Sequence, residues 1–371
     1  MKTKKLSIIL FCLVYFSILI AGCGGGNNDT AGGGDSTVGG DKFKVGFIYI
    51  GPIGDAGWTT AHNNGRLYLE QNLANVETVY IENVAESADA ERVMTELVNQ
   101  GCKVIFATSF GYMDYVINVA AKFPDVVFMH CSGYKTAENV GTYFGQIEQP
   151  RYLTGIMAGK MTKNNQIGYV AAFPIPECIR GINFFTEGVR SVNPDATVKV
   201  VWTNTWYDPA KEKDAAVSLL DANCDVIAQH QDTPGPQQAA QERGAYSVGY
   251  NTDMSSFAPD ANLSSPIWNW GPYYVKTVEA VRNKTWKNDQ YWGSISEGVV
   301  DIAPMTSVVP DDVKTLVNGK RQDMIDGKLN IFAGPIKDQT GAVIVADGQK
   351  MTDDEVLNMD WFVEGVDGSP K

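Results

Sequence analysis

Positive charge and histidine are both scarce in this chain of 371 residues. It carries 30 Lys and Arg against 43 Asp and Glu, which gives a formal net charge of −13 at pH 7. This excess of negative charge argues against nucleic acid or an anionic lipid surface as the main partner. Only three histidines are present, and the sequence has neither an HExxH motif nor a carboxylate–histidine cluster. We therefore expect no metal site and no cofactor.

The motifs of common hydrolases are also missing. The run from Ala107 to Gly111 lacks the first glycine of a G-x-S-x-G nucleophile elbow. His62 lies in the first predicted helix and is expected to be exposed. His130 and His230 end strands and are expected to be hydrogen-bonded polar residues rather than general bases or metal ligands. These absences predict a protein that has no catalytic residues and is not an enzyme.

Cysteines are few and show no CxxC spacing. Two of the six lie near the N-terminus, at Cys12 and Cys23. The other four stand in apolar or strand-like surroundings, which favours buried thiols over metal ligands. In an exported protein a disulfide stays open as an alternative. These four residues are Cys102, Cys131, Cys178 and Cys224.

One long apolar run stands at the N-terminus, between a basic head, MKTKK, and the small residues that precede Cys23. This order is typical of a bacterial lipoprotein signal. It predicts a signal peptide over residues 1–22, cleavage before Cys23 and lipid on the thiol of Cys23. The glycine-rich residues 23–41 would then be a tether. A membrane-spanning anchor is the alternative. Both place the folded part outside the cytoplasmic membrane, on the periplasmic side if an outer membrane exists.

An internal repeat is the strongest pattern in the sequence. A shift of 122 residues places QIGYVAAFPIPE (166–177) on KVGFIYIGPIGD (44–55), and LLDANCDVIAQHQD (219–232) on LVNQGCKVIFATSF (97–110). The register continues without a gap over roughly 120 positions. The two halves are therefore predicted to share one fold.

Each half alternates short strand-like runs with amphipathic helical stretches. KVGFIYI, VETVYIEN, KVIFATS and DVVFMHC have the composition of strands, and Val93, Leu97 and Val98 mark one face of a helix. Strand, helix and strand in series predict a parallel sheet with helices on both faces. The predicted fold class is α/β, with two doubly wound, Rossmann-like lobes that face each other across a cleft.

The residues after the tether exceed the length that one core usually serves, which supports two lobes. We expect an N-terminal lobe of residues 42–163 plus 270–290, and a C-terminal lobe of residues 164–269 plus 291–371.

Two strand-like runs after the repeat, SSPIWNW (264–270) and SISEGVVDIAP (294–304), are suited to cross between the lobes. The tail, LNIFAGPIKDQTGAVIV (329–345), predicts a hairpin with Thr340 and Gly341 in its turn.

In doubly wound sheets, ligands bind beyond the carboxyl ends of the strands. The loops at these ends are unusually rich in aromatic side chains and also hold a few acidic or amide side chains. Flat rings with acidic acceptors suit a planar ligand that carries N–H donors. The candidate ligand-binding residues are Asp55, Trp58, Phe110, Phe173, Glu177, Trp206, Asp232, Asn251, Asp253 and Trp270.

The first of these loops, GPIGDAGW (51–58), is not a phosphate loop. It has neither the Lys that follows the glycines of a Walker motif nor GxGxxG spacing, and Asp55 would repel phosphate. Asp55 is as well suited to cap the following helix as to contact a ligand. Trp58 is favoured for ligand stacking over core packing.

Several long stretches resemble the BMP family, also called PnrA-like or basic membrane proteins, which are substrate-binding lipoproteins of ABC transporters. They are GDAGWTTAHNNG, AAFPIPECIRGINFFTEGVRSVNPDA, VVWTNTWYDPAKE, VGYNTDMS and SPIWNWGPYY. The resemblance covers nearly all of the chain after the tether. It implies the type I periplasmic-binding-protein fold, purine nucleosides as the main ligands and purine bases in some branches.

The resemblance also implies roles for particular residues. The stacking aromatics of the family correspond to Trp58 and to Phe173 or Trp206, and its polar contacts to Asp232 and to Asn251 or Asp253. Trp58 departs from the smaller aromatic-and-Asn arrangement that is common in nucleoside binders, which favours a free base such as adenine.

The sequence therefore predicts the extracytoplasmic, solute-binding component of an ABC importer. It would be a monomer, anchored to the membrane by lipid, that closes on a purine and docks on permease subunits. A sugar-binding importer component is the first alternative, because sugars also stack on Trp and bond to Asp and Asn. A ligand-sensing partner of a membrane receptor is the second.

Overall fold

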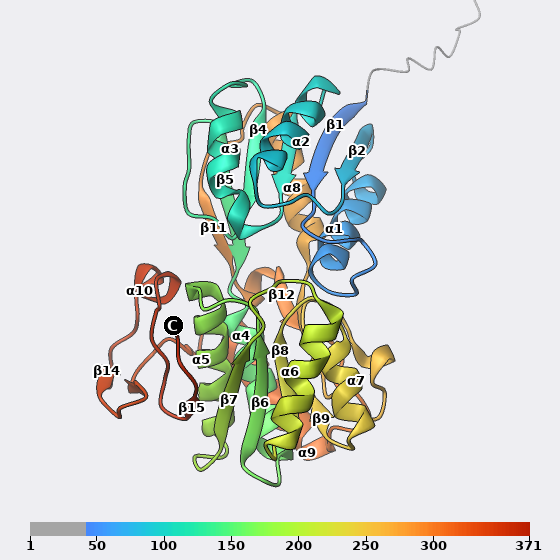
Figure 1. Ribbon diagram of the computed structural model, residues 1–371. Helices are drawn as coiled ribbons and strands as arrows, with labels where there is room; N and C mark the ends of the chain where they lie inside the picture. The colour runs from blue at the N-terminus through green and yellow to red at the C-terminus, as the bar shows by residue number, and fades with distance from the viewer. Residues whose placement is uncertain (1–41) are drawn as a thin grey trace, which may run out of the picture. The chain divides into compact units, whose positions relative to one another are not determined.

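A computed structural model describes residues 42–371, and the structural statements below refer to these residues (Figure 1). The expected signal peptide, Cys23 and the glycine-rich tether lie outside the described residues. Among the helices of residues 42–371, none has the length and apolar character needed to cross a membrane.

The N-terminal lobe is built on a six-stranded sheet in the order β11-β5-β4-β3-β1-β2, in which every neighbouring pair is parallel. Helices α2 and α3 pack together on one face, and α1 and α8 on the other. The strands are β1 (Phe43–Ile48), β2 (Val76–Ile81), β3 (Val104–Ala107), β4 (Val127–Cys131), β5 (Val140–Gly145) and β11 (Gln290–Gly293). The helices are α1 (Trp58–Asn72), α2 (Ala88–Asn99), α3 (Met113–Ala120) and α8 (Trp270–Arg282).

The C-terminal lobe repeats this plan on a five-stranded parallel sheet in the order β15-β7-β6-β8-β9. Helices α6 and α7 cover one face, and α4 and α5 the other, with α9 against α4. The strands are β6 (Gln166–Ala171), β7 (Thr197–Trp202), β8 (Val226–His230), β9 (Tyr246–Ser247) and β15 (Val366–Asp367). The helices are α4 (Glu148–Met161), α5 (Pro176–Arg190), α6 (Pro209–Asp221), α7 (Gly235–Glu242) and α9 (Asp311–Ile325). The α/β class with two doubly wound lobes is confirmed.

The structure also confirms the repeat. Helices α3 and α7 begin at Met113 and Gly235, and α4 and α8 begin at Glu148 and Trp270, so both pairs keep the offset of 122 residues. Local signals explain where several helices begin. Ser87 caps α2 by accepting a hydrogen bond from the backbone N–H of Asp89, and Asp208 caps α6 in the same way, with Pro209 as the first helical residue.

The predicted lobe boundary at residue 163 is wrong for helix α4. This helix follows β5 of the N-terminal sheet, yet it packs against α5 of the C-terminal lobe. Glycines make the contact close, since a Cβ at Gly155 or at Gly188 would lie 2.1 Å from a backbone oxygen of the partner helix. Helix α8 crosses in the opposite direction: it follows a segment of the C-terminal lobe and packs on α1 of the N-terminal lobe. This agrees with the predicted assignment of residues 270–290 to the N-terminal lobe. Strand β11 extends the N-terminal lobe from residue 290 to Gly293.

The chain therefore crosses between the lobes at three places within residues 42–371: before α4, before α8 and after β11. The sequence pointed to the last two. There the strands β10 (Pro266–Trp268) and β12 (Val300–Ile302) pair antiparallel on the C-terminal side of the crossings. The first crossing, from Gly145 to Glu148, was not expected.

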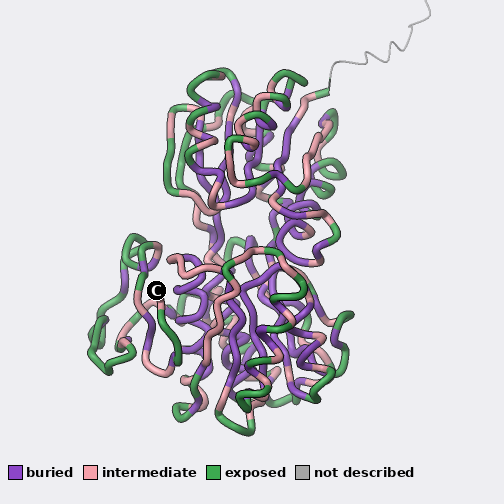
Figure 2. Tube along the Cα trace, in the orientation of Figure 1, coloured by how far each residue is buried: buried purple, intermediate pink, exposed green. Residues whose placement is uncertain are grey.

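Apolar side chains bury both faces of each sheet, and Figure 2 shows the sheet strands mostly as buried. One core cluster joins the α1 and α8 face of the N-terminal sheet to the α4 and α5 face of the C-terminal sheet. Two separate clusters lie under α2 and α3 and under α6 and α7. The four described cysteines are buried and free, so the expected thiols are confirmed.

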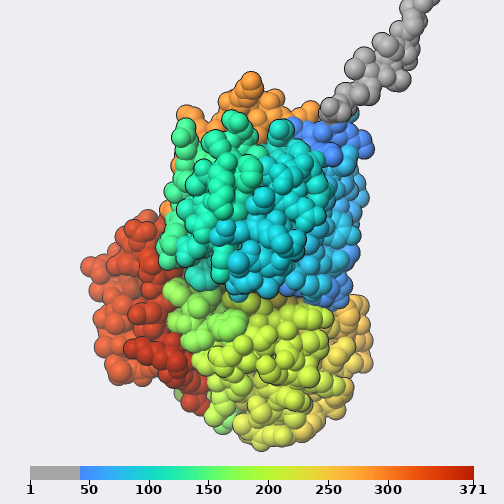
Figure 3. Space-filling model, turned by 45° about the horizontal axis from the view of Figure 1, so that its top comes forward, coloured from blue at the N-terminus to red at the C-terminus, as the bar shows by residue number. Residues whose placement is uncertain are grey.

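The C-terminal segment lies along one side of the C-terminal lobe, coloured red in Figure 3. The expected hairpin is present: β13 (Ile336–Lys337) pairs antiparallel with β14 (Val343–Val345), with Thr340 and Gly341 in the turn. Gly341 has φ +83°, a conformation that glycine adopts without strain. Helix α10 (Asp353–Leu357) and β15 then return to α5 and β7.

The glycines between α4 and α5 give a test of the exchanged helix. Gly188→Val should push α5 away from Tyr152 and lower the free energy of unfolding by about 2 kcal/mol or more. The matched control is Gly319→Ala on α9, where a Cβ has no atom within 4 Å and where better helix propensity should stabilise by up to about 1 kcal/mol. Urea denaturation of both variants measures the difference. Equal stability of the Gly188 variant and the parent would show that the two helices are not in close contact.

Candidate ligand-binding site

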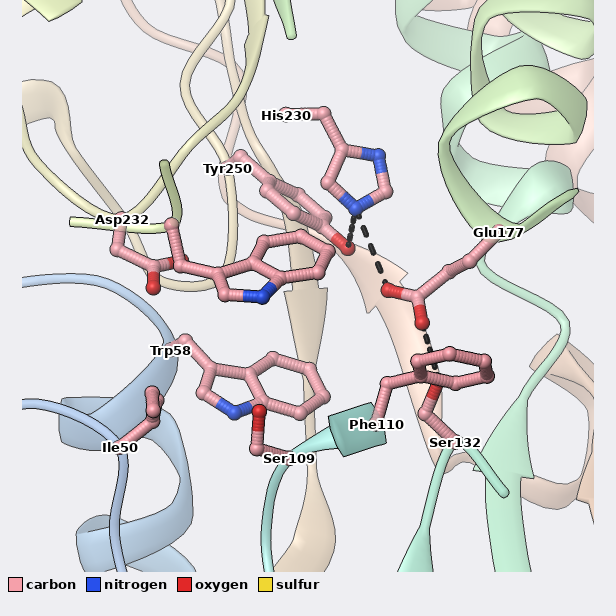
Figure 4. A pocket seen from close by; sticks show the side chains of 10 residues that line it. Ile50, Trp58, Ser109, Phe110, Ser132, Glu177, His230, Asp232 and Tyr250 are labelled. Carbon is pink, nitrogen blue, oxygen red and sulfur yellow. Dashed lines mark hydrogen bonds and ion pairs between the residues drawn. The ribbon is translucent and has the colours of Figure 1, made fainter. Parts of the chain in front are cut away.

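A pocket lies between the carboxyl ends of the two sheets (Figure 4). The cavity itself is small, about 20 Å³, and all the space between its lining atoms, with the open mouth included, amounts to about 340 Å³. Its lining comes from loops that follow β1, β3 and β4 of the N-terminal lobe and β6, β7, β8 and β9 of the C-terminal lobe. The lining residues are Ile50, Trp58, Ser109, Phe110, Ser132, Glu177, Trp206, His230, Asp232 and Tyr250.

Trp58 lines the pocket and is also anchored in the protein. It is the first residue of α1, and its indole N–H donates a hydrogen bond of 2.6 Å to the backbone oxygen of Thr108. Its ring meets those of Trp268 and Trp270 edge to face, at centroid distances of 5.6 and 6.2 Å. These contacts fix the plane of the indole, so Trp58 presents a rigid aromatic surface to the pocket.

Asp55 does not line this pocket and acts as a capping residue. One carboxylate oxygen accepts hydrogen bonds from the backbone N–H groups of Gly57 and Thr60, and the other from that of Thr59. Both oxygens are thereby used by the turn that begins α1. The expectation of a ligand contact at Asp55 is replaced by the capping role that the sequence left open, and this turn places Trp58.

The same turn brings the two lobes into contact. A Cβ at Gly57 would lie only 2.2 Å from the backbone oxygen of Asp232, so the close approach requires glycine. Beside it, the hydroxyl of Thr252 in the C-terminal lobe donates a hydrogen bond to the backbone oxygen of Ala56 in the N-terminal lobe. The lobes are therefore closed on this side of the pocket.

Three further predicted aromatics lie at or behind the pocket. Phe110 and Trp206 line it, from the N-terminal and the C-terminal lobe respectively. Phe173 contacts Trp206 edge to face at a centroid distance of 5.2 Å, and it supports that ring rather than lining the pocket.

Asp232 is the buried carboxylate of the pocket wall, with an exposed fraction of 5%. Asn251 lies behind it, where its amide N–H donates a hydrogen bond of 3.2 Å to Asp232 and its amide oxygen accepts one from the indole N–H of Trp268. Burial raises the pKa of Asp232 well above its usual value, and the nearby carboxylates of Asp55, Glu212 and Glu177 raise it further. Among the described residues, no hydrogen bond reaches the second carboxylate oxygen of Asp232. Asn251 thus orients Asp232 and does not itself line the pocket.

Asp253 is not part of the pocket, although the sequence made it a candidate. It is exposed, and its carboxylate accepts a hydrogen bond from the backbone N–H of Ser255. Asp253 was a candidate because it stands two residues after Asn251, close to the carboxyl end of a strand. The chain turns away from the pocket after Asn251.

Glu177 links the lobes at the other end of the pocket. It lies in the first turn of α5, and one of its carboxylate oxygens accepts a hydrogen bond from the hydroxyl of Ser132, which follows β4. The other oxygen lies 3.3 Å from Nε2 of His230. Burial alone would raise the pKa of Glu177, but the hydrogen bond to His230, the charge of Arg180 and the Ser132 hydroxyl together lower it.

His230 is buried beside Glu177 and Tyr250. Burial lowers its pKa to about 4, with a further contribution from the Arg151 guanidinium. His230 is therefore neutral near pH 7, and its contact with Glu177 is a hydrogen bond from a neutral ring to a carboxylate. Arg151 lies over the Tyr250 ring, 3.9 Å from its centroid, and supports this wall from behind.

Comparison with known proteins decides the family. The model of the Bmp family, ABC transporter substrate-binding proteins that are PnrA-like, matches residues 42–333. The chain belongs to this family. Like other substrate-binding components of ABC transporters, this family member has a small molecule as its ligand, a permease as its partner and an extracytoplasmic place of action.

Two curated relatives of this Bmp protein differ in their assigned ligands. A purine-binding protein of Brucella abortus is 47% identical over 88% of this chain and 93% of its own length. A candidate glucose-binding protein of an ABC transporter of Haloferax volcanii is 42% identical over 89% of this chain and 81% of its own length.

A solved ABC transporter solute-binding protein of Aeropyrum pernix shares the fold of the Bmp protein. It has a TM-score of 0.68 at 18% identity and covers 85% of this chain and 95% of its own. The fold of the Bmp protein is the type I periplasmic-binding-protein fold, as the resemblance implied.

The sequence missed half of the lining of the Bmp protein's pocket. His230 is hydrogen-bonded, as expected, and it also lies in the wall. The other missed residues are an isoleucine, two serines and a tyrosine, and their one signal is their position shortly after a strand. The missed residues are Ile50, Ser109, Ser132, His230 and Tyr250. In the part of the Bmp protein that the structure describes, no group of three or more His, Cys, Asp or Glu is arranged to hold a metal ion.

Trp270 and His62 lie in a buried aromatic stack behind Trp58, so two expectations are wrong. Trp270 was a ligand candidate, yet it is only 1% exposed and stacks on His62 at a centroid distance of 5.0 Å. His62 was expected to be exposed, yet it is fully buried, and its Nδ1 lies 2.5 Å from the hydroxyl of Tyr274. The reason is α8, which crosses from the C-terminal lobe and covers this face of α1.

The burial of His62 predicts a pH effect on stability. Burial lowers the pKa of His62 well below its ordinary value of 6.5, so the native state keeps it neutral while the unfolded chain takes up a proton below pH 6.5. Stability from the neutral imidazole is present above pH 6.5 and is lost as the pH falls. Relative to His62→Asn, which has no titrating ring, the parent Bmp protein should lose about 2 kcal/mol between pH 7 and pH 5. Urea denaturation at both pH values measures this, and parallel behaviour of the two proteins would contradict the buried, neutral His62.

Proposed function

We propose that this Bmp protein binds a purine between its lobes, with a free base such as adenine favoured over a nucleoside, and delivers it to an ABC permease. The observation that carries the proposal is the composition of one pocket: an indole from each lobe and a buried carboxylate with one oxygen left for a ligand. Closure of the lobes around the hinge would bring the two halves of the site together.

The two indoles support a flat ligand. Trp58 has ring partners in the N-terminal core and Trp206 has Phe173 and His230, and within the described residues no ring contact joins Trp58 to Trp206. Both rings line the same pocket from opposite lobes. A planar heteroaromatic ring can use both faces at once, and stacking of a base on an aromatic side chain contributes about 1 to 3 kcal/mol.

The carboxylate supports a ligand edge with nitrogen atoms. Asp232 is crowded by other carboxylates, so an N–H donor from a ligand would stabilise its charge, and its protonated form could donate to a ring nitrogen. Adenine offers N–H groups and ring nitrogens side by side along its edges. Hydrogen bonds to such an edge select among ligands more strongly than stacking does.

A sugar is the second candidate, favoured by the assigned ligand of the Haloferax volcanii relative. Its hydroxyl groups could bond to Asp232 and Glu177, and its C–H face could stack on an indole. A puckered ring fits less closely than a flat one between two indoles, which is why the purine is preferred. The identity of 47% with the purine-binding protein of Brucella abortus supports the same choice.

We assign direct ligand contact to Trp58, Phe110, Trp206, Asp232 and Glu177. Phe173 and Asn251 would act through Trp206 and Asp232. For the residues outside the described part, we propose the signal peptide over residues 1–22 and a lipid anchor at Cys23 that holds a monomer at the membrane.

The proposal is tested by calorimetric titration of the purified protein after unfolding and refolding, which removes any ligand carried over from the cell. The titrants are adenine, guanine, hypoxanthine, adenosine, guanosine and a panel of sugars that includes glucose. Micromolar or tighter binding of a purine is expected. Binding of a sugar, with no binding of any purine, would contradict the proposal and favour the second candidate, a sugar ligand.

Stacking on Trp206 is tested by alanine substitution. Trp206→Ala should weaken purine binding about 5- to 150-fold, which corresponds to the loss of one stacking face. Trp202→Ala is the matched control, because Trp202 lies at the end of β7 and its indole N–H donates to the backbone oxygen of Ser369, away from the pocket. Equal affinities of the two variants would remove Trp206 from the site.

Asp232→Asn tests the carboxylate in the same assay. It should change the order of preference among purines and weaken the best of them by about tenfold or more, because a hydrogen bond to a charged group is lost. Asp253→Asn is the matched control and should leave every affinity as in the parent, because Asp253 is exposed outside the pocket. An equal loss for every purine would show that Asp232 acts on the fold and not on the ligand edge.

A further inference from the structure

We propose that the hydrogen bond between Ser132 and Glu177 is a latch that determines ligand specificity. It closes the pocket toward a second groove, so that a bare purine ring fits and the same ring carrying ribose is rejected. This inference rests on the proposed function and adds the two residues that would set its preference for a base over a nucleoside.

The latch stands between two cavities. Beyond the pocket lies a larger groove with a volume of about 340 Å³, against about 20 Å³ for the pocket. Three residues line both cavities, namely Phe110, Ser132 and Glu177. Figure 4 shows these three on one side of the Trp58 ring, with Ile50 and Asp232 on the other side. A ring held at Asp232 would therefore point its opposite edge at the latch.

The groove has room and polar groups for a substituent that the pocket cannot hold. Its walls come from β5 and β11 of the N-terminal lobe and from α5 and α10 of the C-terminal lobe. Several of the side chains that line it can bond to hydroxyl groups, which makes it chemically suited to a sugar. They include Tyr134, Thr142, Arg180, Gln290, Asp354 and Asn358. A ribose attached to the bound ring could reach these groups only through the wall that Ser132 and Glu177 form.

The Glu177 half of the latch is held in place. One of its carboxylate oxygens accepts the hydrogen bond from Ser132, and the other faces His230 at 3.3 Å. With both oxygens engaged and an exposed fraction of 7%, the side chain has little freedom to swing aside for a larger ligand. Its neighbour Arg180 is itself bound, through Nε, to the buried carboxylate of Glu148 at 2.5 Å.

The Ser132 half is held by its backbone. Ser132 has φ +69°, in the left-handed region that non-glycine residues seldom adopt. The next residue, Gly133, packs so closely on His130 that a Cβ there would lie 1.8 Å from its Nδ1. His130 is fixed in turn by a contact of 2.8 Å between its Nε2 and the backbone oxygen of Ser109. The turn therefore fixes the position from which the Ser132 hydroxyl meets Glu177.

The test compares adenine with adenosine in the refolded protein by calorimetry. The parent should bind adenosine at least about tenfold more weakly than adenine, a difference of about 1.4 kcal/mol. Glu177→Ala and Ser132→Gly each open the wall, and glycine suits the backbone of residue 132. In both variants the dissociation constant of adenosine divided by that of adenine should fall about tenfold. This fall is expected whether or not the affinity for adenine itself changes.

The matched control is Thr252→Ala. This change removes the other hydrogen bond between the lobes, from Thr252 to the backbone oxygen of Ala56, at a place that does not line the groove. It should shift both affinities equally and leave their ratio unchanged. A narrowed ratio in this variant too would overturn the latch, because lobe closure in general would then set the preference.

The remaining outcomes separate the latch from the proposed function. Equal binding of adenine and adenosine by the parent, or an unchanged ratio in both opened variants, would overturn the latch while leaving purine binding intact. If the parent binds no purine at all, the proposed function fails and the latch fails with it.

Discussion

The structure depends on an exchange of helices between the lobes. Helix α4 follows the N-terminal sheet and packs on α5, and α8 follows strand β10 of the C-terminal lobe and packs on α1. Glycine makes each contact close: Gly155 of α4 and Gly188 of α5 lie between those two helices, and Gly65 of α1 lies against Trp270 of α8. This exchange holds the carboxyl ends of two parallel sheets opposite each other, which is the place where doubly wound folds bind ligands. The pocket follows from this arrangement.

Inside the pocket, burial gives the two acidic residues different roles. Glu177 shares its oxygens with Ser132 and His230 and has a lowered pKa, so it is a satisfied carboxylate that joins the lobes. Asp232 has one hydrogen bond from Asn251 and a strongly raised pKa, so it is the carboxylate that a ligand could stabilise. Between them lies the Trp58 ring, whose plane is fixed by Thr108 and the buried tryptophans. A rigid ring with one unsatisfied acceptor beside it is the arrangement on which the proposed binding of a flat molecule with N–H groups rests.

The sequence predicted several pocket residues that follow a strand, because parallel strands bring their carboxyl ends to one edge of the sheet. Trp58, Phe110, Trp206, Glu177 and Asp232 follow such ends and line the pocket. The sequence could not predict the direction in which each side chain points. Asp55 turns back to cap α1, and Asp253 points to solvent. The sequence also missed contacts made at long range, since the burial of His62 comes from α8, about 200 residues later, and the local pattern of α4 does not specify which lobe it joins.

In the proposed complex, a purine ring lies between Trp58 and Trp206 with one edge on Asp232. A crystal structure of the refolded protein with adenine would show this arrangement. We expect the adenine ring between the two indoles, an adenine nitrogen within hydrogen-bond distance of Asp232, and the hydrogen bond from Ser132 to Glu177 still formed. Adenine in the outer groove, or an empty pocket that accepts glucose instead under the same conditions, would contradict it.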